Sequence, residues 1–210
     1  MTSTPKAQVP ARQVLLATRN TKKLAELRRI LAPLIDVQVL GLADVPRFDE
    51  VPETGATFAD NALLKAREGA AHTGLIAIAD DSGLAVDELN GMPGVLSARW
   101  AGSHGDDEAN LRLLLAQLAD TPDDRLAASF VCAAALVTPA GIEHVVQGRM
   151  PGRLVREPVG DNGFGYDPIF IADGEAVTNG ELPAARKDAI SHRGIALRSL
   201  APYLVEAIGG

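Results

Sequence analysis

The chain is poor in aromatic residues and in the side chains that most often bind transition metals. Only 4% of its 210 residues are aromatic although 47% are hydrophobic, so a sizeable core would consist of Ala, Leu, Val and Ile. One cysteine and four scattered histidines argue against a zinc site. The cysteine, Cys132, lies within the apolar run 130–137, which favours a core residue over a nucleophile and weakly indicates a reducing compartment.

Positive charge is also scarce. Twenty Lys and Arg residues against 27 Asp and Glu give a net charge of -7, which argues against nucleic-acid and membrane-surface partners, since both need a basic footprint. A polyanionic substrate would therefore need the help of a cation. No apolar run approaches membrane-spanning length, and residues 1–12 contain no signal-peptide core. We predict a cytoplasmic protein with a flexible polar leader, residues 1–12, and a single domain, residues 13–210.

Strands alternate with helices in the first half of the predicted structure, and an antiparallel hairpin follows. This order of elements predicts an α/β protein with a mixed β-sheet. Ser191 is expected to cap the helix at the end of the sequence. The predicted strands are 14–17, 35–42, 75–79, 126–137 and 142–147, and the predicted helices include 21–31, 57–73 and one that begins at Asp106 or Asp107.

Two adjacent carboxylates, Asp80 and Asp81, follow the predicted buried strand 75–79. Successive side chains of a strand point to opposite faces, so only one of the pair can enter a given cleft, and we predict that it is Asp81. Residues 82–83 then predict a tight turn into a second short strand, 84–89. The alternative is a hairpin whose acids are merely solvated.

A polar turn, residues 18–21, connects the first strand to the first helix. Such a turn exposes backbone N–H groups at the positive end of the helix dipole, which is a ready anion site. Lys22 and Lys23 would lie in the first helical turn, where cations oppose the dipole, so they indicate an anion such as phosphate, above all at Lys23. The alternative is an ion pair with Glu26. Neither GxxxxGK nor a GxGxxG that opens a helix occurs in the sequence.

Three further segments could approach the same ligand. Lys65 on the second helix could bind phosphate, although an exposed helical lysine is more often only solvated. Glycines flank Phe164 and precede Tyr166, so both rings could approach a flat ligand, with core packing as the alternative. His192 and Arg193 would begin the last helix, where cations again indicate a nearby anion or ligand edge.

Five blocks of the sequence, in order, resemble the inosine triphosphate pyrophosphatase family. These enzymes hydrolyse deaminated purine nucleoside triphosphates to the monophosphate and pyrophosphate. The resemblance implies an elongated mixed β-sheet flanked by helices, two lobes with a central active-site cleft, Mg²⁺ as cofactor, and a homodimer. The blocks are TRNTKKLAE from Thr18, ETGATFADNALLKA from Glu53, ADDSGLAVDELNGMPGVLSARWAG from Ala79, GFGYDPIF from Gly163 and SHR from Ser191.

The resemblance also implies the roles of individual residues. Asp81 matches the proton acceptor, and Glu53 with Asp81 match the magnesium ligands. Whether Asp80 or Asp81 removes the proton stays open. Donors near Lys187, His192 and Arg193 are expected to read the 6-oxo group of the base. The expected substrate-binding residues, with Lys65 added on physical grounds, are Thr18, Arg19, Asn20, Thr21, Lys22, Lys23, Lys65, Ser82, Phe164, Gly165, Tyr166, Asp167, Lys187, His192 and Arg193.

Three residues, in two segments, depart from the family pattern. Arg19 stands where glycine is common, and its side chain would either crowd the phosphates or add a cation. Asn179 and Gly180 stand where an alanine-containing stretch is more usual. Two other classes of function remain open: a non-catalytic nucleotide sensor, which would have no need of both carboxylates, and a broader nucleotide or phosphomonoester hydrolase. A serine hydrolase is disfavoured because no GxSxG motif occurs.

Overall fold

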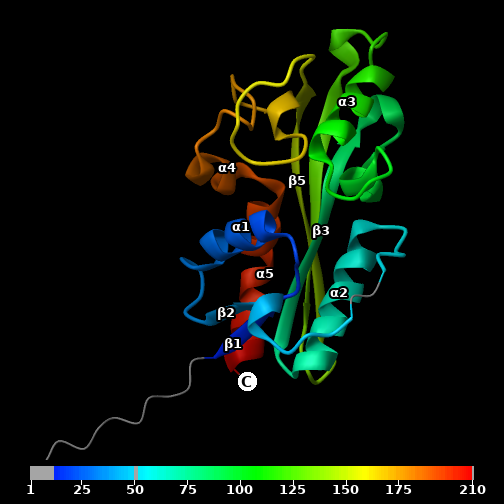
Figure 1. The fold of residues 1–210 in the computed structure, drawn as a ribbon. Helices are drawn as coiled ribbons and strands as arrows, with labels where there is room; N and C mark the ends of the chain where they lie inside the picture. The colour runs from blue at the N-terminus through cyan, green and yellow to red at the C-terminus, as the bar shows by residue number, and fades with distance from the viewer. Residues whose placement is uncertain (1–11, 50–51, 210) are drawn as a thin grey trace, which may run out of the picture.

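The computed structural model describes residues 12–49 and 52–209, and it contains a six-stranded mixed β-sheet (Figure 1). Except for Arg12, the predicted leader lies outside the described residues. The strand order is β2-β1-β3-β4-β5-β6; β1 is parallel to β2 and β3, and the other pairs are antiparallel. The strands are β1 (Gln13–Leu16), β2 (Gln38–Gly41), β3 (Ile76–Val86), β4 (Ala127–Val137), β5 (Glu143–Leu154) and β6 (Phe170–Ala172).

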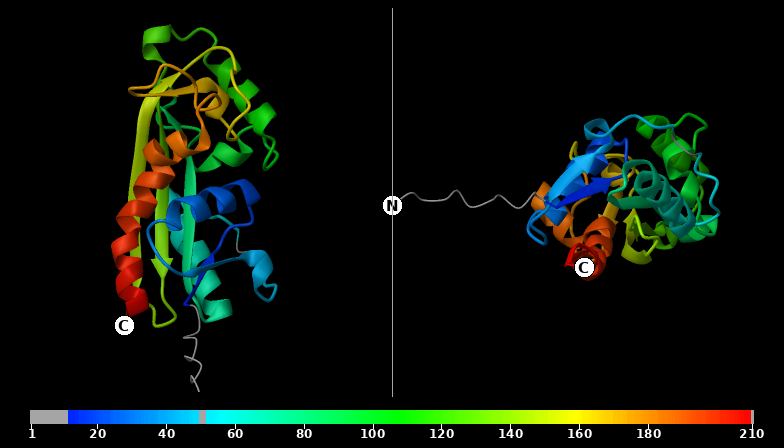
Figure 2. Two further views of the ribbon diagram at one scale, coloured as in Figure 1. Left: turned by 90° about the vertical axis from the view of Figure 1, so that its left-hand side faces the viewer. Right: turned by 90° about the horizontal axis from the view of Figure 1, so that it is seen from below.

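The long strands β3, β4 and β5 extend through two lobes (Figure 1; Figure 2). In the lower lobe, α1 (Thr21–Leu31), α2 (Phe58–Thr73) and α5 (His192–Gly209) cover the sheet. The upper lobe contains α3 (Asp107–Gln117) and β6, and the short helix α4 (Ala184–Ile190), which the sequence pattern did not reveal, precedes α5. The predicted fold class is therefore confirmed. No helix in the described ranges is long and apolar enough to cross a membrane.

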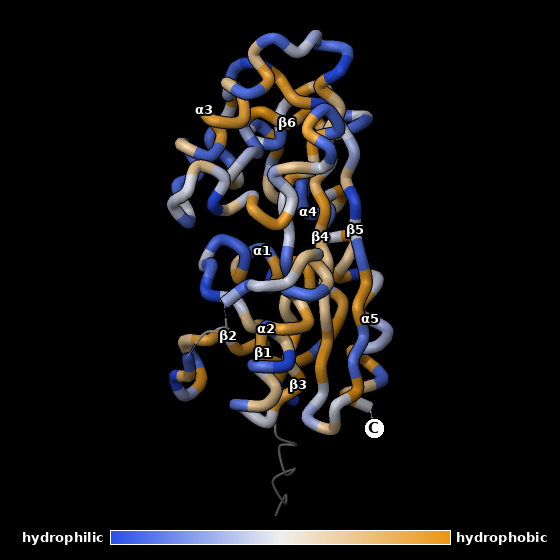
Figure 3. The backbone as a smooth tube through the Cα atoms, turned by 90° about the vertical axis from the view of Figure 1, so that its right-hand side faces the viewer, coloured by the Kyte–Doolittle hydropathy of each residue, from blue (hydrophilic) through white to orange (hydrophobic). Residues whose placement is uncertain are grey.

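Alternation along the central strands separates the core of the lower lobe into two layers. Leu15, Ala77 and Ala79 pack with the small residues of α2, and Val14 and Ile78 lie in the opposite layer with α1 and α5. Hydrophobic residues run along β4, which belongs to both layers (Figure 3). Because Asp80 and Asp81 continue this alternation, they project into different layers.

β3 differs from the predicted hairpin. The prediction of a turn at 82–83 was wrong, since the strand continues through both acids to Val86 and pairs with β4 along its whole length. The reason is a short 3-10 helix, η3 (Gly94–Arg99), packed on β3. A side chain at Gly83 would collide with Ser97 Oγ and Gly94 O, so this glycine permits close packing instead of a turn. Asp80 and Asp81 consequently lie in mid-strand.

The helix ends follow the sequence signals. The helix predicted for 57–73 begins at a capping box formed by Thr57 and Asp60, and Gly74, with φ of 67°, ends it. Asp106 caps α3, and Ser191 Oγ accepts a hydrogen bond from Gly194 N at 3.0 Å in α5. The second strand of the predicted hairpin, β5, extends to Leu154 instead of residue 147.

Candidate active site

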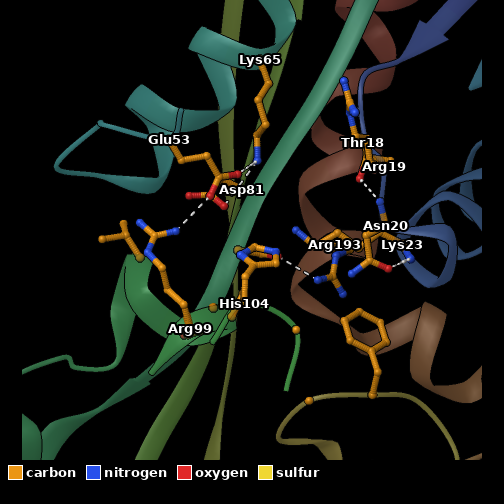
Figure 4. A pocket seen from close by; sticks show the side chains of 18 of the residues that line it. Thr18, Arg19, Asn20, Lys23, Glu53, Lys65, Asp81, Arg99, His104 and Arg193 are labelled. Atoms are coloured by element: carbon orange, nitrogen blue, oxygen red, sulfur yellow. Dashed lines mark hydrogen bonds and ion pairs between the residues drawn. The ribbon is translucent and has the colours of Figure 1, made fainter. Parts of the chain in front are cut away.

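A cavity of about 470 Å³ lies between the lobes, beside Asp81 in the middle of β3. It gathers side chains from both ends of the chain (Figure 4). Thr21, Lys22 and Lys187, which were also expected at the site, do not line it. The expected residues that do are Thr18, Arg19, Asn20, Lys23, Glu53, Lys65, Asp81, Ser82, Phe164, Gly165, Tyr166, Asp167, His192 and Arg193.

Asp81 faces α2 from β3 and is 6% exposed. Asn61 Nδ2 donates a hydrogen bond to Asp81 Oδ2 at 3.0 Å, and Lys65 Nζ lies 3.5 Å from Asp81 Oδ1. Burial raises the pKa of Asp81, and the opposing effect of Lys65 and Lys23 is too small to cancel it. Asp81 is therefore an acid in the cleft whose proton affinity is higher than usual.

Asp80 lies on the opposite face, fully buried in an ionic network. Lys23 Nζ and Arg193 Nε lie 3.1 and 3.3 Å from Asp80 Oδ2. Although burial opposes ionisation, these two cations hold the pKa of Asp80 well below its usual range. Arg193 Nη1 also donates to Glu26 Oε2 at 2.8 Å. The alternative pair of Lys23 with Glu26 does not form, because each residue has another partner.

Glu53 and Asp81 converge on one ammonium group. Lys65 Nζ lies 2.7 Å from Glu53 Oε1 and 3.5 Å from Asp81 Oδ1, and its side chain is only 14% exposed, so Lys65 is not a solvated surface lysine. Burial would raise the pKa of Glu53, but Lys65, Lys23 and Arg99 together lower it. Glu53 is therefore held as a carboxylate that faces the cleft.

This pair of carboxylates fits a hard divalent cation. Mg²⁺ uses one or two protein carboxylates and takes its other ligands from water and substrate phosphates. Within the described part of the chain, no group of three or more His, Cys, Asp and Glu residues is placed to hold a metal ion. Glu53 and Asp81 are the residues here that could hold it.

The turn before α1 differs in detail from the predicted anion site. Asn20 Oδ1 accepts hydrogen bonds from the N–H groups of Lys22 and Lys23 at 3.0 and 3.1 Å, so these backbone donors already have a partner. The Lys23 side chain and Arg19 line the cavity instead. Arg19 Nη2 donates to the Phe48 carbonyl at 3.1 Å, which joins the turn to the loop before α2.

The loop around Phe164 presents this ring to the cavity. Gly163 and Gly165, with φ of 75° and 62°, flank it in a backbone conformation that favours glycine. The Lys187 ammonium and the Arg193 guanidinium lie 5.2 and 5.1 Å from the centroid of the Phe164 ring. The ring is thus close to cations on the side of α4 and α5.

Tyr166 has a different environment from Phe164. Its side chain is buried in the core of the upper lobe, and Tyr166 Oη donates a hydrogen bond to Ser97 O at 2.9 Å. Core packing, the alternative considered for both aromatics, therefore describes Tyr166, although part of it still lines the cavity. Asp167 accepts hydrogen bonds from Phe164 N at 2.8 Å and Lys187 Nζ at 2.5 Å.

His192 lies at the start of α5 and is almost fully buried. Burial, together with Arg193 and Lys187, lowers the pKa of His192 well below its usual value, so the ring is neutral at pH 7. It stacks on Phe130 with the ring centroids 4.9 Å apart. His144, on β5, is half-buried and stacks on Tyr203 with a centroid distance of 4.2 Å.

Asn61, Arg99 and His104 lie in the site region and carried no prediction of a role. Asn61 is bonded to Asp81, and its position four residues before Lys65 was the available signal. Arg99 and His104 line the cavity from the segment after β3 (Figure 4). The block that suggested the family contains Arg99 and ends just before His104, but no spacing rule brings either residue to the cavity.

Asn179 and Gly180, which depart from the family pattern, contact Asp167 from the side away from the cavity. Asn179 Nδ2 donates a hydrogen bond to Asp167 Oδ1 at 3.2 Å, and Gly180 N donates to the Asp167 carbonyl at 3.1 Å. A side chain at Gly180 would approach the Val159 carbonyl to 2.6 Å, so the backbone is too close there for any larger residue. The two residues together support Asp167 from outside the cavity.

The cleft of this two-lobed α/β fold contains a pair of carboxylates. It also contains cations from a strand-to-helix turn. This combination is typical of nucleotide-binding proteins. Within that class, the chain belongs to the Ham1 family, whose family model matches residues 14–203. This finding and the relatives below confirm the resemblance identified in the sequence.

Curated relatives and solved structures agree with this assignment. A dITP/XTP pyrophosphatase of Nocardia farcinica is 65% identical over 194 residues, which cover 91% of this chain and 94% of the relative. The crystal structure of the Mycobacterium abscessus nucleoside-triphosphatase / dITP/XTP pyrophosphatase is 62% identical, with a TM-score of 0.74, and covers 90% of this chain and 99% of its own. A HAM1 protein of Coxiella burnetii is 40% identical, with a TM-score of 0.81, over 93% and 99% of the two chains.

Proposed function

We propose that the protein hydrolyses deaminated purine nucleoside triphosphates (ITP, dITP and XTP) to the monophosphate and pyrophosphate, and so removes them from the nucleotide pool. The observation that carries this proposal is the convergence of Glu53 and Asp81 on Lys65, in a cleft that also holds Lys23 and Phe164. The names of the relatives described above support the same reaction.

Each side chain then has a chemical task. Mg²⁺, when bound by Glu53 and Asp81, supplies positive charge to the phosphates. Lys23 and Lys65 add charge on the side of the departing pyrophosphate, and Asp81 orients a water in line with the α phosphorus and accepts its proton. The raised pKa of Asp81 suits the role of proton acceptor.

Base selection follows from hydrogen bonding. Hypoxanthine and xanthine present a 6-oxo acceptor and an N1–H donor, whereas adenine reverses both, so a buried site that pairs them rejects adenine strongly. His192 and Arg193 both line the cavity and are the candidate donors for the 6-oxo group. Lys187 lies behind Phe164 and acts through Asp167.

The first experiment measures pyrophosphate release from ITP, dITP and XTP beside ATP, GTP and dGTP, with Mg²⁺ or with EDTA. We expect release from the first three only, and its loss in EDTA. Orthophosphate as the product, or equal turnover of all six nucleotides, would instead indicate a broader phosphohydrolase. Nucleotide binding without turnover would indicate the sensor.

Phe164 and Tyr166 should respond differently to substitution. Stacking on an aromatic ring contributes about 1–3 kcal/mol per base, so Phe164→Ala should raise KM for ITP and XTP alike by about tenfold or more. Tyr166→Phe keeps the buried ring and loses only the hydrogen bond to Ser97 O, so it should leave KM unchanged within about twofold and lower the unfolding free energy by about 1 kcal/mol. Steady-state kinetics and urea unfolding of both variants test the contrast, and equal KM changes would contradict it.

The homodimer and the cytoplasmic location stay predictions. Both come from the sequence and the family resemblance, and the single chain described here does not bear on either. Sedimentation equilibrium of the purified protein measures the first directly.

A further inference from the structure

Arg99 enters the cleft from the upper lobe, at the end of η3. This short helix is fixed by Ser97, whose Oγ accepts a hydrogen bond from Leu84 N at 2.9 Å and whose carbonyl accepts one from Tyr166 Oη at 2.9 Å. The backbone of Arg99 is therefore held against the same strand that carries Asp81. Its side chain points into the cleft toward Glu53 (Figure 4).

The Arg99 guanidinium has unused hydrogen-bond donors. Its Nη1 lies 3.5 Å from Glu53 Oε2, and within the described ranges it makes no hydrogen bond. Lys23 and Lys65, on the other wall, already donate to Asp80 and Glu53 at 3.1 and 2.7 Å. A guanidinium carries five N–H donors in a planar fork that matches two phosphate oxygens. With a side chain 32% exposed, Arg99 can still bind a ligand in the cleft.

The position of Arg99 determines which part of the substrate its side chain can contact. The phosphate turn and the Glu53 and Lys65 pair line the same cavity as Arg99, so a triphosphate bound there lies within reach of all of them. Arg99 pairs with Glu53, whereas the cations near the Phe164 ring are Lys22, Lys187 and Arg193. Phosphate oxygens of the leaving group are therefore its nearest partners, and their charge increases as the bond to the α phosphorus breaks.

We propose that Arg99 is a substrate-binding residue of the upper lobe that holds the departing pyrophosphate by a bidentate contact. This inference rests on the proposed function. Water adds its oxygen to the α phosphorus and gives a proton to Asp81, the bond from that phosphorus to the α–β bridging oxygen breaks, and its electron pair leaves with pyrophosphate. Arg99 exchanges one long ion pair with Glu53 for two charge-assisted hydrogen bonds to the leaving group.

Equilibrium binding tests this assignment without turnover. Isothermal titration calorimetry with inorganic pyrophosphate and with inosine monophosphate, each in EDTA and in Mg²⁺, compares wild type with Arg99→Gln and Arg99→Lys. We expect Arg99→Gln to weaken pyrophosphate binding about tenfold or more and inosine monophosphate binding by less than about twofold. Arg99→Lys keeps the charge but loses the planar fork, so it should fall between the two.

Arg67→Gln is the matched control. Arg67 forms an exposed pair with Glu143, with two hydrogen bonds of 2.7 Å, and it does not line the cavity. The same change of side chain there should leave both affinities unaltered. Thermal unfolding of all variants checks that each is folded.

A role for Arg99 that acts only through Glu53 gives a different result. In that case Arg99→Gln would have no effect on pyrophosphate binding once Glu53 is changed to Gln, whereas direct contact predicts a similar loss in both backgrounds. Unchanged pyrophosphate binding by Arg99→Gln, or an equal loss for inosine monophosphate, would overturn the inference.

The outcome can be separated from that of the proposed function. If the wild type turns over dITP but Arg99→Gln binds pyrophosphate as well as the wild type does, the inference is refuted and the proposed function stands. Binding of pyrophosphate that depends on Arg99, in a protein that turns over none of the six nucleotides, refutes the proposed function and supports the pyrophosphate site.

Discussion

Asp81→Asn is expected to reduce kcat for dITP and XTP by about 10³-fold, because an amide cannot accept the proton of the attacking water. The substitution preserves the size of the side chain and an oxygen for the hydrogen bond from Asn61. Nucleotide affinity in EDTA should therefore change little. Single-turnover measurement of pyrophosphate release, together with equilibrium binding, tests both statements.

The same variant should be at least as stable as the wild type. Because burial raises the pKa of Asp81, ionisation of this group opposes folding above the pKa of the unfolded chain, and Asn removes that effect at pH 7. A variant that unfolds more easily would show that lost activity reflects lost structure. Retained activity with an intact fold would contradict the role of Asp81 as proton acceptor.

Asp80→Asn should instead lower the unfolding free energy by about 3 kcal/mol. Its carboxylate is the partner of Lys23 and Arg193, and its removal leaves Arg193, a fully enclosed cation, with Glu26 as its remaining acidic hydrogen-bond partner. Urea unfolding at pH 7 measures the difference. Glu108→Gln is a suitable control, since Glu108 pairs with Arg112 on the surface, where the side chains are 73% and 74% exposed, and such a pair contributes about 0–1 kcal/mol.

The pH dependence of this difference has a definite sign. The folded chain holds the pKa of Asp80 well below its unfolded value of about 3.9, so the stabilisation is complete above that value and is lost as the pH falls toward the folded pKa. The stability advantage of the wild type over Asp80→Asn should therefore shrink below about pH 4. A constant difference from pH 7 to pH 3 would contradict the ionised pair.

Sequence reasoning predicted the features that depend on local pattern. The capping box at Thr57 and the alternation that separates Asp80 from Asp81 need only neighbouring residues, and both are present. The turn at 82–83 was wrong because Gly83 serves a contact with η3 that no local pattern encodes. For the same reason Arg99 could not be assigned to Glu53, which lies 46 residues earlier and on the other lobe.

Aromatic residues show the same limit. Phe164 and Tyr166 are two positions apart in one glycine-rich loop, and composition alone gives both the same role. The structure separates them, because Tyr166 is drawn into the upper core by Leu84 and Phe130 while Phe164 faces the cations of the cleft. The two rings differ in their burial, which depends on packing between segments that are distant in the sequence.

The ionic network around Asp80 has a consequence for the order in which the protein becomes functional during synthesis. Arg193, which neutralises Asp80 and Glu26, is separated from them by 113 and 167 residues and emerges from the ribosome long after both acids. Until then, two acids destined for the interior lack this counter-charge, and the cleft lacks a wall. The nascent chain therefore has no complete site, and a chain that ends before α5 should be both unstable and inactive. Nucleotide turnover should therefore begin only after α5 has docked on the sheet.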